Sequence, residues 1–326
     1  MSALKRALRI GGLTGIAITG YAAYAQYATR RFEHLDPLNA NAPGTYLDID
    51  GTAIHYVEAG RGEDVVLIHG WNGSTFSFRY TIPELAQRYR VIAIDLMGYG
   101  YSARMRDADY SLTGQSEIVA QAMDRLGVTN AAVIGHSMGG AVATRLALRH
   151  PDWVRKLVLV DSVNVTEMRQ ATRFGKLLRV VMPLGAPLLL HPYRSRRRIF
   201  LTAVHDPAYL TPEIEEGYFR PMHMKGHLRS MGQQLTSRQD DELLSPGDIT
   251  QPTLILWGEH DAWLRPELGE RLNALIPDSR LTLVPSAGHL PLEEQPDFCN
   301  REIMRFLQDD EAPDEAALAP EAETAS

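Results

Sequence analysis

Short, uninterrupted hydrophobic runs alternate with longer amphipathic segments along most of the chain. Runs of four or five residues have the length and composition of strands buried in a parallel sheet. They lie at Val65–Ile68, Val91–Ile94, Ala131–Ile134, Leu157–Val160, Thr253–Trp257 and Leu281–Val284. Helical patterns lie between them, at about Thr113–Leu126, up to His150, at Pro266–Ile276 and up to Leu307. These strand–helix–strand units predict an α/β fold with a mostly parallel central sheet and helices on both faces.

One further segment precedes this strand–helix pattern, and a second one interrupts it. Before the first buried run, Tyr46–Asp50 and Ala53–Glu58 alternate in polarity around an Asp50-Gly51 turn, which predicts a β-hairpin. From Ser162 to Ile249 strand-like runs are absent, which indicates a mostly helical insertion. The predicted domains are an α/β core at 44–161 and 250–308 and a helical cap at 162–249.

The N-terminal segment carries no charge over the 20 residues from Ile10 to Thr29 and is flanked by basic residues on both sides. A helix of that length spans a hydrocarbon core of about 30 Å, so we expect residues 1–31 to form a single N-terminal membrane anchor or a signal segment. Cleavage and export stay open, because Ala23-Tyr24-Ala25 matches an A-x-A site. A peripheral or plain soluble helix is the third interpretation, since four glycines and three threonines make the stretch only weakly hydrophobic. The flanking charges do not decide the side of the membrane.

Composition fits a globular protein. Of 326 residues, 44% are hydrophobic and 22% are charged, which excludes a disordered or fibrous chain. The single cysteine excludes a disulfide framework and a cysteine zinc site. Residues 309–326 hold seven acidic and no basic residues, so the remaining 33 acidic residues (40 minus 7) balance the 33 basic ones. This predicts an acidic disordered tail, and the lack of aromatic residues among the basic ones argues against a nucleic-acid partner.

Basic residues gather in the first half of the predicted cap. One set shares a helical face and a second set follows it: Arg169, Arg173, Lys176 and Arg179, then Arg194, Arg196, Arg197 and Arg198. They form either the solvated outer face of a cap whose apolar face packs on the core, or a surface that lies against anionic lipid. An N-terminal anchor would favour the second interpretation.

A G-x-S-x-G motif, Gly135-His136-Ser137-Met138-Gly139, directly follows a predicted strand and opens a predicted helix. This is the context of a nucleophile elbow, in which glycines permit a sharp turn that projects the serine oxygen above the strand end. The helix N-terminus behind the serine favours developing negative charge. Ser137 is therefore the predicted nucleophile.

A serine nucleophile needs a base, and the base needs an acid that orients it. His289 follows the last predicted strand, and Asp261 lies in the loop after the preceding strand. Loops at the same edge of a parallel sheet can reach the elbow, so Ser137, Asp261 and His289 form the predicted catalytic triad. Asp161, at the end of the strand before the insertion, is the alternative acid.

Hydrolysis at a carbonyl also needs two N–H donors for the oxyanion. Met138, directly after the nucleophile, supplies the first backbone N–H. Trp71, in the His69-Gly70-Trp71 segment after the first buried run, is placed to supply the second. His69 itself is interpreted as a structural residue of that turn.

Together these segments resemble the α/β-hydrolase superfamily from about Tyr46 to Leu307. The resemblance rests on His69-Gly70, Asp95–Ser102, the serine elbow, Gly258–Asp261 and Gly288-His289. Haloalkane dehalogenases and epoxide hydrolases of this superfamily carry an aspartate at the elbow, where this chain has Ser137, so both chemistries are disfavoured. The chain looks most like capped serine hydrolases of the esterase and monoacylglycerol-lipase kind.

The resemblance implies hydrolysis of a small-molecule ester or lipid with an apolar acyl group, through an acyl-enzyme on Ser137 and without a cofactor. His223 and His227 have the spacing of a metal-binding pair, but no third ligand lies nearby in the sequence, so no metal is predicted. A carbon–carbon bond hydrolase or a thioesterase would use the same triad. A haloperoxidase-like side reaction and a non-enzymatic scaffold are further alternatives.

Overall fold

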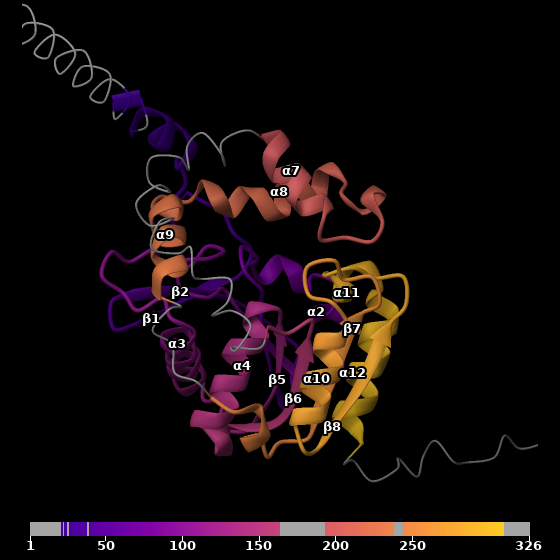
Figure 1. Cartoon of the computed structure of the whole chain (residues 1–326). Coiled ribbons are helices and arrows are strands. Elements are labelled where there is room, and N and C mark those ends of the chain that lie inside the picture. Colours follow the sequence, from indigo (N-terminus) through magenta and orange to yellow (C-terminus); the bar gives the residue numbers. More distant parts are fainter. Residues whose placement is uncertain are drawn as a thin grey trace, which may run out of the picture.

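The computed structural model describes residues 21–37 (apart from 22 and 25), 39–163, 193–237 and 244–309. Its centre is an eight-stranded sheet with the strand order β1-β2-β4-β3-β5-β6-β7-β8 (Figure 1). The strands are β1 (Thr45–Ile49), β2 (Thr52–Ala59), β3 (Asp64–Ile68), β4 (Arg90–Ile94), β5 (Ala131–His136), β6 (Val154–Val160), β7 (Thr253–Gly258) and β8 (Ser279–Val284). The β1–β2 hairpin and the β2–β4 pair are antiparallel, and all other pairs are parallel. The predicted α/β fold is confirmed.

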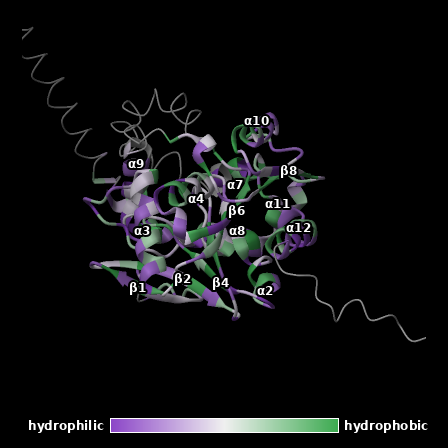
Figure 2. Ribbon diagram, turned by 90° about the horizontal axis from the view of Figure 1, so that it is seen from below, coloured by the Kyte–Doolittle hydropathy of each residue, from purple (hydrophilic) through white to green (hydrophobic). Residues whose placement is uncertain are grey.

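Helices cover both faces of this sheet. One face carries α3 (Leu112–Arg125), α4 (Met138–Arg149) and α10 (Glu267–Leu275), and the other carries α2 (Ile82–Leu85), α11 (Pro291–Glu294) and α12 (Pro296–Gln308). Every residue of β5 and β7 is buried, because a central strand of a doubly covered sheet has no solvent face. Figure 2 shows hydrophobic residues gathered in the interior between the two helix layers.

The parallel strands bring the candidate catalytic residues to one edge of the sheet. Ser137 follows β5 and Asp161 follows β6, whereas Asp261 and His289 lie in the loops after β7 and β8. Ligands of open parallel sheets bind in the crevice outside the carboxyl ends of the strands. The fold therefore places these four residues where a substrate would be bound.

Residues 193–237, the longest described part of the insertion, are called the cap below. It contains no strand and consists of α7 (Tyr193–Leu201), α8 (Pro212–Phe219) and α9 (His227–Ser237), joined by short 3₁₀ turns η4 (Pro207–Tyr209) and η5 (Arg220–His223). α7 and α8 lie over the carboxyl edge of the sheet (Figure 1). A hydrophobic cluster includes Phe32 of the N-terminal segment together with Leu210, Ile214, Tyr218, Phe219 and Met222. The extent predicted for the cap, 162–249, stays a prediction, since 164–192 and 238–243 lie outside the described residues.

A buried ionic network fastens the cap to the core. The Glu293 carboxylate of α11 accepts hydrogen bonds from Arg79 Nη1 and from the Tyr209 hydroxyl, each at 2.5 Å, and also from the Tyr218 hydroxyl. Arg79 belongs to the core, whereas Tyr209 and Tyr218 belong to the cap. Removing one partner of a buried ion pair costs about 3–5 kcal/mol, so this network is a substantial constraint on where the cap lies.

The membrane location predicted through a single N-terminal anchor is corrected by the structure. No helix among the described residues is long and apolar enough to cross a membrane. Most of the uncharged stretch, up to Gly20, lies outside the described residues, as do the basic face Arg169–Arg179 and the acidic tail after Asp309. The described positions between 21 and 32 are helical, and this segment ends with Phe32 packed into the cap cluster. An absence of charge reveals the length of a stretch but not its hydrophobicity, and here glycine and threonine keep the hydrophobicity low.

Candidate active site

Ser137 lies on a strained turn between β5 and α4. Its backbone φ is +53° and its ψ is −117°, a conformation that only a well-packed surrounding can impose on a residue with a side chain. A Cβ atom added at Gly135 would stand 2.4 Å from the Gly139 carbonyl oxygen, and one at Gly139 would stand 2.1 Å from that of Ile68. The two glycines of the motif are thus required by close backbone approach.

The structure brings the three predicted triad side chains into one hydrogen-bonded chain. His289 Nε2 lies 2.9 Å from Ser137 Oγ, and His289 Nδ1 lies 2.7 Å from Asp261 Oδ2. Because a carboxylate accepts only, Nδ1–H is the donor to Asp261, and Nε2 is left to accept the serine proton. All three residues are buried, at 7% exposure or less. This is the geometry of a nucleophile, a base and an orienting acid.

The two candidate acids have different environments. Asp261 Oδ1 accepts hydrogen bonds from the N–H groups of Trp263 (2.7 Å) and Leu264 (2.9 Å), which fix its carboxylate beside His289. Asp161 Oδ1 accepts from Gly258 N–H at 2.8 Å, but its Oδ2 is buried without a hydrogen-bond partner in the described part of the chain. Burial and the neighbouring Asp261 raise the pKa of Asp161 well above its usual value. The geometry therefore favours Asp261 as the acid that orients His289.

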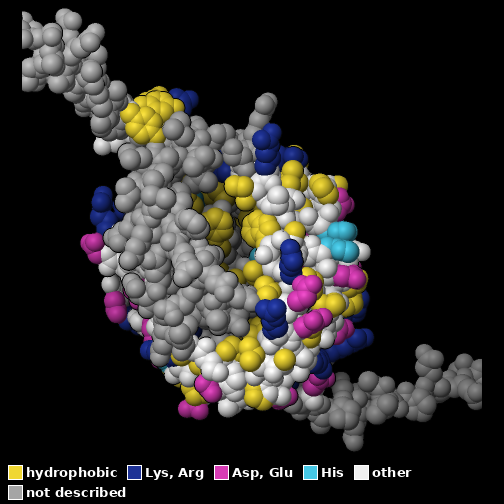
Figure 3. Space-filling model, viewed as in Figure 1, with side chains coloured by type: hydrophobic (Ala, Val, Ile, Leu, Met, Phe, Trp, Pro, Cys, Tyr) yellow, Lys and Arg dark blue, Asp and Glu magenta, His cyan; other side chains and the backbone are white. Residues whose placement is uncertain are grey.

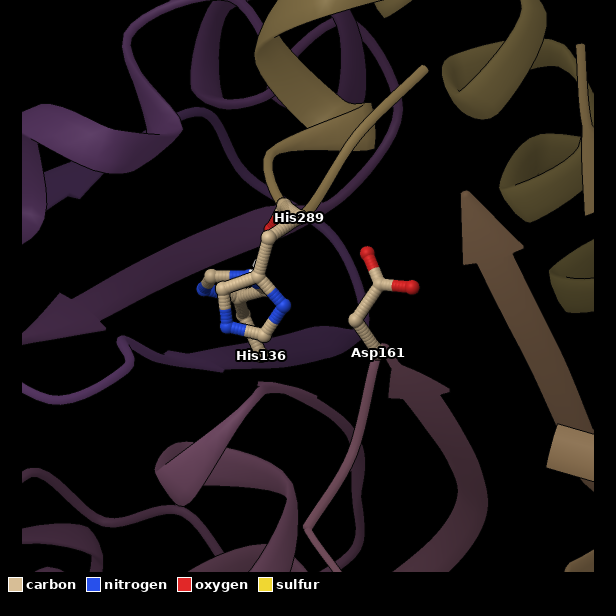
Figure 4. Close-up of side chains that lie close together, drawn as sticks. All are labelled: His136, Asp161 and His289. Carbon is tan, nitrogen blue, oxygen red and sulfur yellow. Dashed lines mark hydrogen bonds between the residues drawn. The ribbon is translucent and has the colours of Figure 1, made fainter. Parts of the chain in front are cut away.

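His136, which precedes the nucleophile, packs against the His289 ring and binds the His289 backbone. Figure 4 shows the two imidazoles together, with the Asp161 carboxyl group beside them. His136 Nε2 lies 2.7 Å from the His289 carbonyl oxygen, so it is the donor, and burial lowers the pKa of His136 to about 3. His136, Asp161 and His289 each offer a potential metal ligand atom within 4.8 Å of the others. Both nitrogens of His289 are, however, already engaged with Ser137 and Asp261, and this favours acid–base chemistry over metal binding.

The two predicted oxyanion donors lie next to the nucleophile. Met138 is the first residue of α4, and Gly70 approaches so closely that an added Cβ would stand 3.1 Å from Ser137 Cβ. Trp71, the next residue, lines the same pocket as Ser137. His69 donates from Nδ1 to the Gly70 carbonyl (2.8 Å) and accepts the Leu96 N–H at Nε2 (3.0 Å). Burial lowers the pKa of His69, so this neutral imidazole holds the turn, as interpreted from the sequence.

Ser137 opens into an apolar pocket between the core and the cap. The pocket encloses about 940 Å³, its open mouth included, and Figure 3 shows hydrophobic side chains around a hollow in this face of the molecule. Its apolar walls include Phe32, Ile199, Phe200, Phe219, Met222 and Met231. Such a pocket suits an acyl chain or an aromatic group.

The His223–His227 pair does not form a metal site with the other described residues. His223 Nδ1 lies 2.9 Å from the Phe32 carbonyl oxygen, and His227 is buried in the pocket wall. Among the described residues, the only cluster of three potential ligands is the one around His289. Burial lowers the pKa of His227 to about 3.

Three residues of this site were missed by sequence reasoning. Trp263 packs on the His289 imidazole, with ring centroids 5.1 Å apart. Glu294 accepts hydrogen bonds from backbone groups around His289. Arg196, grouped by sequence with the cap arginines, lines the pocket. A glutamate five residues after the histidine was visible, but only the folded loops show what it contacts.

The chain is similar to known hydrolases in sequence and in fold. A family model described as alpha/beta hydrolase fold matches residues 65–296. The uncharacterized hydrolase YugF of Bacillus subtilis is 30% identical over 283 residues, which cover 83% of this chain and all of that protein. A 2-hydroxy-6-oxononadienedioate/2-hydroxy-6-oxononatrienedioate hydrolase of a Pseudomonas species is 31% identical over 280 residues, 80% of this chain and 93% of that one. The crystal structure of a membrane phospholipase A, a bacterial virulence factor, has a TM-score of 0.70 at 25% identity and covers 94% of this chain and 97% of its own.

Epoxide hydrolases are also among the similar proteins, although this chain carries Ser137 at its elbow. The region matched by the family model contains β3 to β8, the cap and all three residues of the hydrogen-bonded Ser137–His289–Asp261 chain. The protein is therefore a hydrolase and belongs to the α/β-hydrolase family.

Proposed function

We propose that the protein is a serine hydrolase that cleaves carboxylic esters with apolar acyl groups through Ser137, His289 and Asp261. The observation that carries the proposal is the hydrogen-bond chain from Ser137 Oγ to His289 Nε2 (2.9 Å) and from His289 Nδ1 to Asp261 Oδ2 (2.7 Å). The reaction is a two-step acyl transfer that needs no cofactor.

In the first step Ser137 Oγ attacks the ester carbonyl while His289 Nε2 takes its proton. Asp261 keeps the imidazole in the tautomer that can accept this proton and stabilises the resulting imidazolium. The N–H groups of Met138 and Trp71 hold the oxyanion, each worth about 3 kcal/mol by analogy with measured donors. Protonated His289 then gives its proton to the leaving alcohol.

In the second step His289 activates a water molecule, which releases the acid from Ser137. The strained φ of +53° at Ser137 fixes the oxygen above the strand end in both steps. The elbow thus positions the Ser137 oxygen, and the loops after β7 and β8 carry the residues for proton transfer, Asp261 and His289.

The apolar pocket and one structural relative support an ester as the substrate. The lining is dominated by aliphatic and aromatic side chains, and the membrane phospholipase A named above hydrolyses an ester bond by its name. Epoxide hydrolysis is disfavoured because an elbow aspartate, the nucleophile of that chemistry in the superfamily, is replaced by Ser137.

Carbon–carbon bond hydrolysis is the second candidate. Relatives at 30–31% identity are hydrolases of 2-hydroxy-6-oxo dienoates, and the same triad would serve such a substrate. Thioester hydrolysis would also use this triad and is the third candidate.

The test combines labelling with a substrate panel. A fluorophosphonate probe should label Ser137, and the purified protein should hydrolyse p-nitrophenyl esters faster than matched thioesters or a 2-hydroxy-6-oxo dienoate. Faster cleavage of the dienoate would replace the ester assignment by the carbon–carbon one. Absence of labelling in a folded sample would reject serine hydrolysis altogether.

A further inference from the structure

Arg196 of α7 lies in the wall of the same pocket as Ser137. We infer that its guanidinium binds an anionic group, a carboxylate or a phosphate, that the substrate carries in addition to the scissile bond. This inference rests on the proposed function and narrows its substrate class. The preferred substrate is then an acyl compound with an apolar body and one negative charge, rather than a wholly neutral ester.

Among the described residues, the guanidinium of Arg196 contacts aromatic rings rather than a counterion. Its central carbon lies 5.3 Å from the ring centroid of Phe32 and 5.0 Å from that of Phe219. Its one hydrogen bond within the described residues runs from Nη1 to the Met222 sulfur at 3.9 Å, and sulfur is a weak acceptor. Nε is buried without a partner, and no carboxylate of the described residues forms an ion pair with this side chain.

Three other arginines in or near the cap have carboxylate or carbonyl partners. Arg197, the next residue of α7, pairs with Glu215 at 2.7 Å, and Arg79 pairs with Glu293. Arg104, which is buried, donates to the carbonyl groups of Ser102, Gly100 and Pro221. Each of these three guanidinium groups has a carboxylate or carbonyl oxygen as partner, whereas Arg196, which faces the pocket, has neither among the described residues.

An anion would complete this site. A guanidinium has five N–H donors arranged in a fork that matches two oxygens of a carboxylate or phosphate. Stacking on aromatic faces leaves the edge of that fork available, and a desolvated guanidinium binds an anion more strongly than one in water. Burial lowers the pKa of Arg196, which agrees with a site to which the described residues contribute no negative partner.

The competing explanation is structural: Arg196 joins Phe32 of the N-terminal segment to Phe219 of the cap by cation–π contacts alone. That explanation predicts a loss of stability on replacement of Arg196, with equal effects on all substrates. The anion site predicts a loss of discrimination between charged and neutral substrates, which is a different measurement.

The experiment compares p-nitrophenyl half-esters of dicarboxylic acids with p-nitrophenyl alkanoates of the same chain length, as the carboxylate arm. Lysophosphatidic acid and the monoacylglycerol with the same acyl chain form the phosphate arm. The wild-type protein, Arg196→Met, Arg196→Lys and the matched control Arg198→Met, an exposed position of the same helix, are assayed for kcat, KM and melting temperature.

We expect Arg196→Met to lower the ratio of kcat/KM for the anionic over the neutral substrate at least tenfold, mainly through KM, in one or both arms. Arg196→Lys should retain part of the ratio, and Arg198→Met should leave it unchanged. An unchanged ratio in Arg196→Met, or equal losses for both substrates with a lower melting temperature, would overturn the anion site. If the wild-type protein hydrolyses neither member of a pair and Ser137 is not labelled, it is the proposed function that fails.

Discussion

The Glu294 carboxylate accepts the backbone N–H of Gly288 at 2.8 Å, one residue before His289. Its other oxygen accepts the N–H of His205 from the cap at 2.6 Å, and His289 N–H donates to the Ala203 carbonyl oxygen at 2.6 Å. The loop that presents the base is therefore held jointly by α11 and by the chain that follows α7. Cap position and histidine position are coupled through these contacts.

From this relationship we expect Glu294→Ala to lower kcat at least tenfold, because a displaced imidazole transfers protons poorly. KM should change much less, since Glu294 does not line the pocket around Ser137. Glu294→Gln should recover part of kcat, because its amide oxygen still accepts a backbone N–H. A change confined to KM, or identical defects in both variants, would show that Glu294 does not act by positioning His289.

Ser137→Ala should remove ester hydrolysis by a factor on the order of 10⁶, since loss of a nucleophile is not compensated by the remaining groups. The protein should remain folded, because alanine fits wherever serine does and Ser137 contributes no side-chain cap to α4. The measurement is kcat/KM on an activated ester, with the melting temperature as control. Retention of a tenth of the activity would exclude Ser137 as the nucleophile.

Asp261→Asn should lower kcat by about 10⁴, because an amide favours the wrong tautomer of His289 and cannot stabilise its cation. Asp161→Asn should change kcat by less than about threefold, since its carboxyl group resembles a neutral amide when its pKa is raised and Oδ1 can still accept Gly258 N–H. The opposite order of losses would make Asp161 the catalytic acid.

Asp161→Asn should also change how the stability of the protein depends on pH. A carboxyl whose pKa is raised in the folded state contributes stability at low pH that is lost as the pH rises through the raised value. For this group alone, stability should therefore fall toward neutral pH, and Asp161→Asn should remove this contribution, so the stability difference between variant and wild type should shift in favour of the variant as the pH rises. Urea denaturation of both proteins at a series of pH values measures this difference.

The contribution of His227 to stability should depend on pH in the opposite direction. Burial lowers its pKa to about 3, so the stability it contributes is complete above the ordinary value of 6.5 and is lost as the pH falls from there toward 3. For this residue alone the loss between pH 6.5 and 5 is about 2 kcal/mol. His227→Gln should flatten the acid limb of the stability curve, and an unchanged slope would show that His227 is already accessible to protons in the folded state.

The sequence predicted the framework because its signals are local. Val65–Ile68 and Ala131–Ile134 are continuous apolar runs, and the structure contains strands there, because a central strand of a doubly covered sheet is buried on both faces. Ser137, Asp261 and His289 could be singled out because each follows a strand, and parallel strands end at one edge.

What could not be predicted depends on contacts between distant segments. Arg196 has the same sequence surroundings as Arg197 and Arg198, and only the packing of α7 against Phe32 and Phe219 distinguishes it. Glu294 likewise accepts one of its hydrogen bonds from His205, almost ninety positions earlier in the chain. The membrane anchor was predicted wrongly because its length and flanking charges were given more weight than its weak hydrophobicity, and no helix among the described residues is long and apolar enough to cross a membrane.

Phe32 also has a practical implication for protein production. The family match begins at residue 65, and a designer of an expression clone would trim the chain shortly before β1. Such trimming would delete a residue that lines the pocket and holds the Arg196 guanidinium. Under the proposed function, a shortened protein would keep Ser137 and should still hydrolyse activated reporter esters, so an assay with such esters alone would not reveal the loss of Phe32. Its substrate selectivity should nevertheless differ, because the pocket would lack the wall formed by Phe32. Substrate screens should therefore be run on protein that retains residue 32.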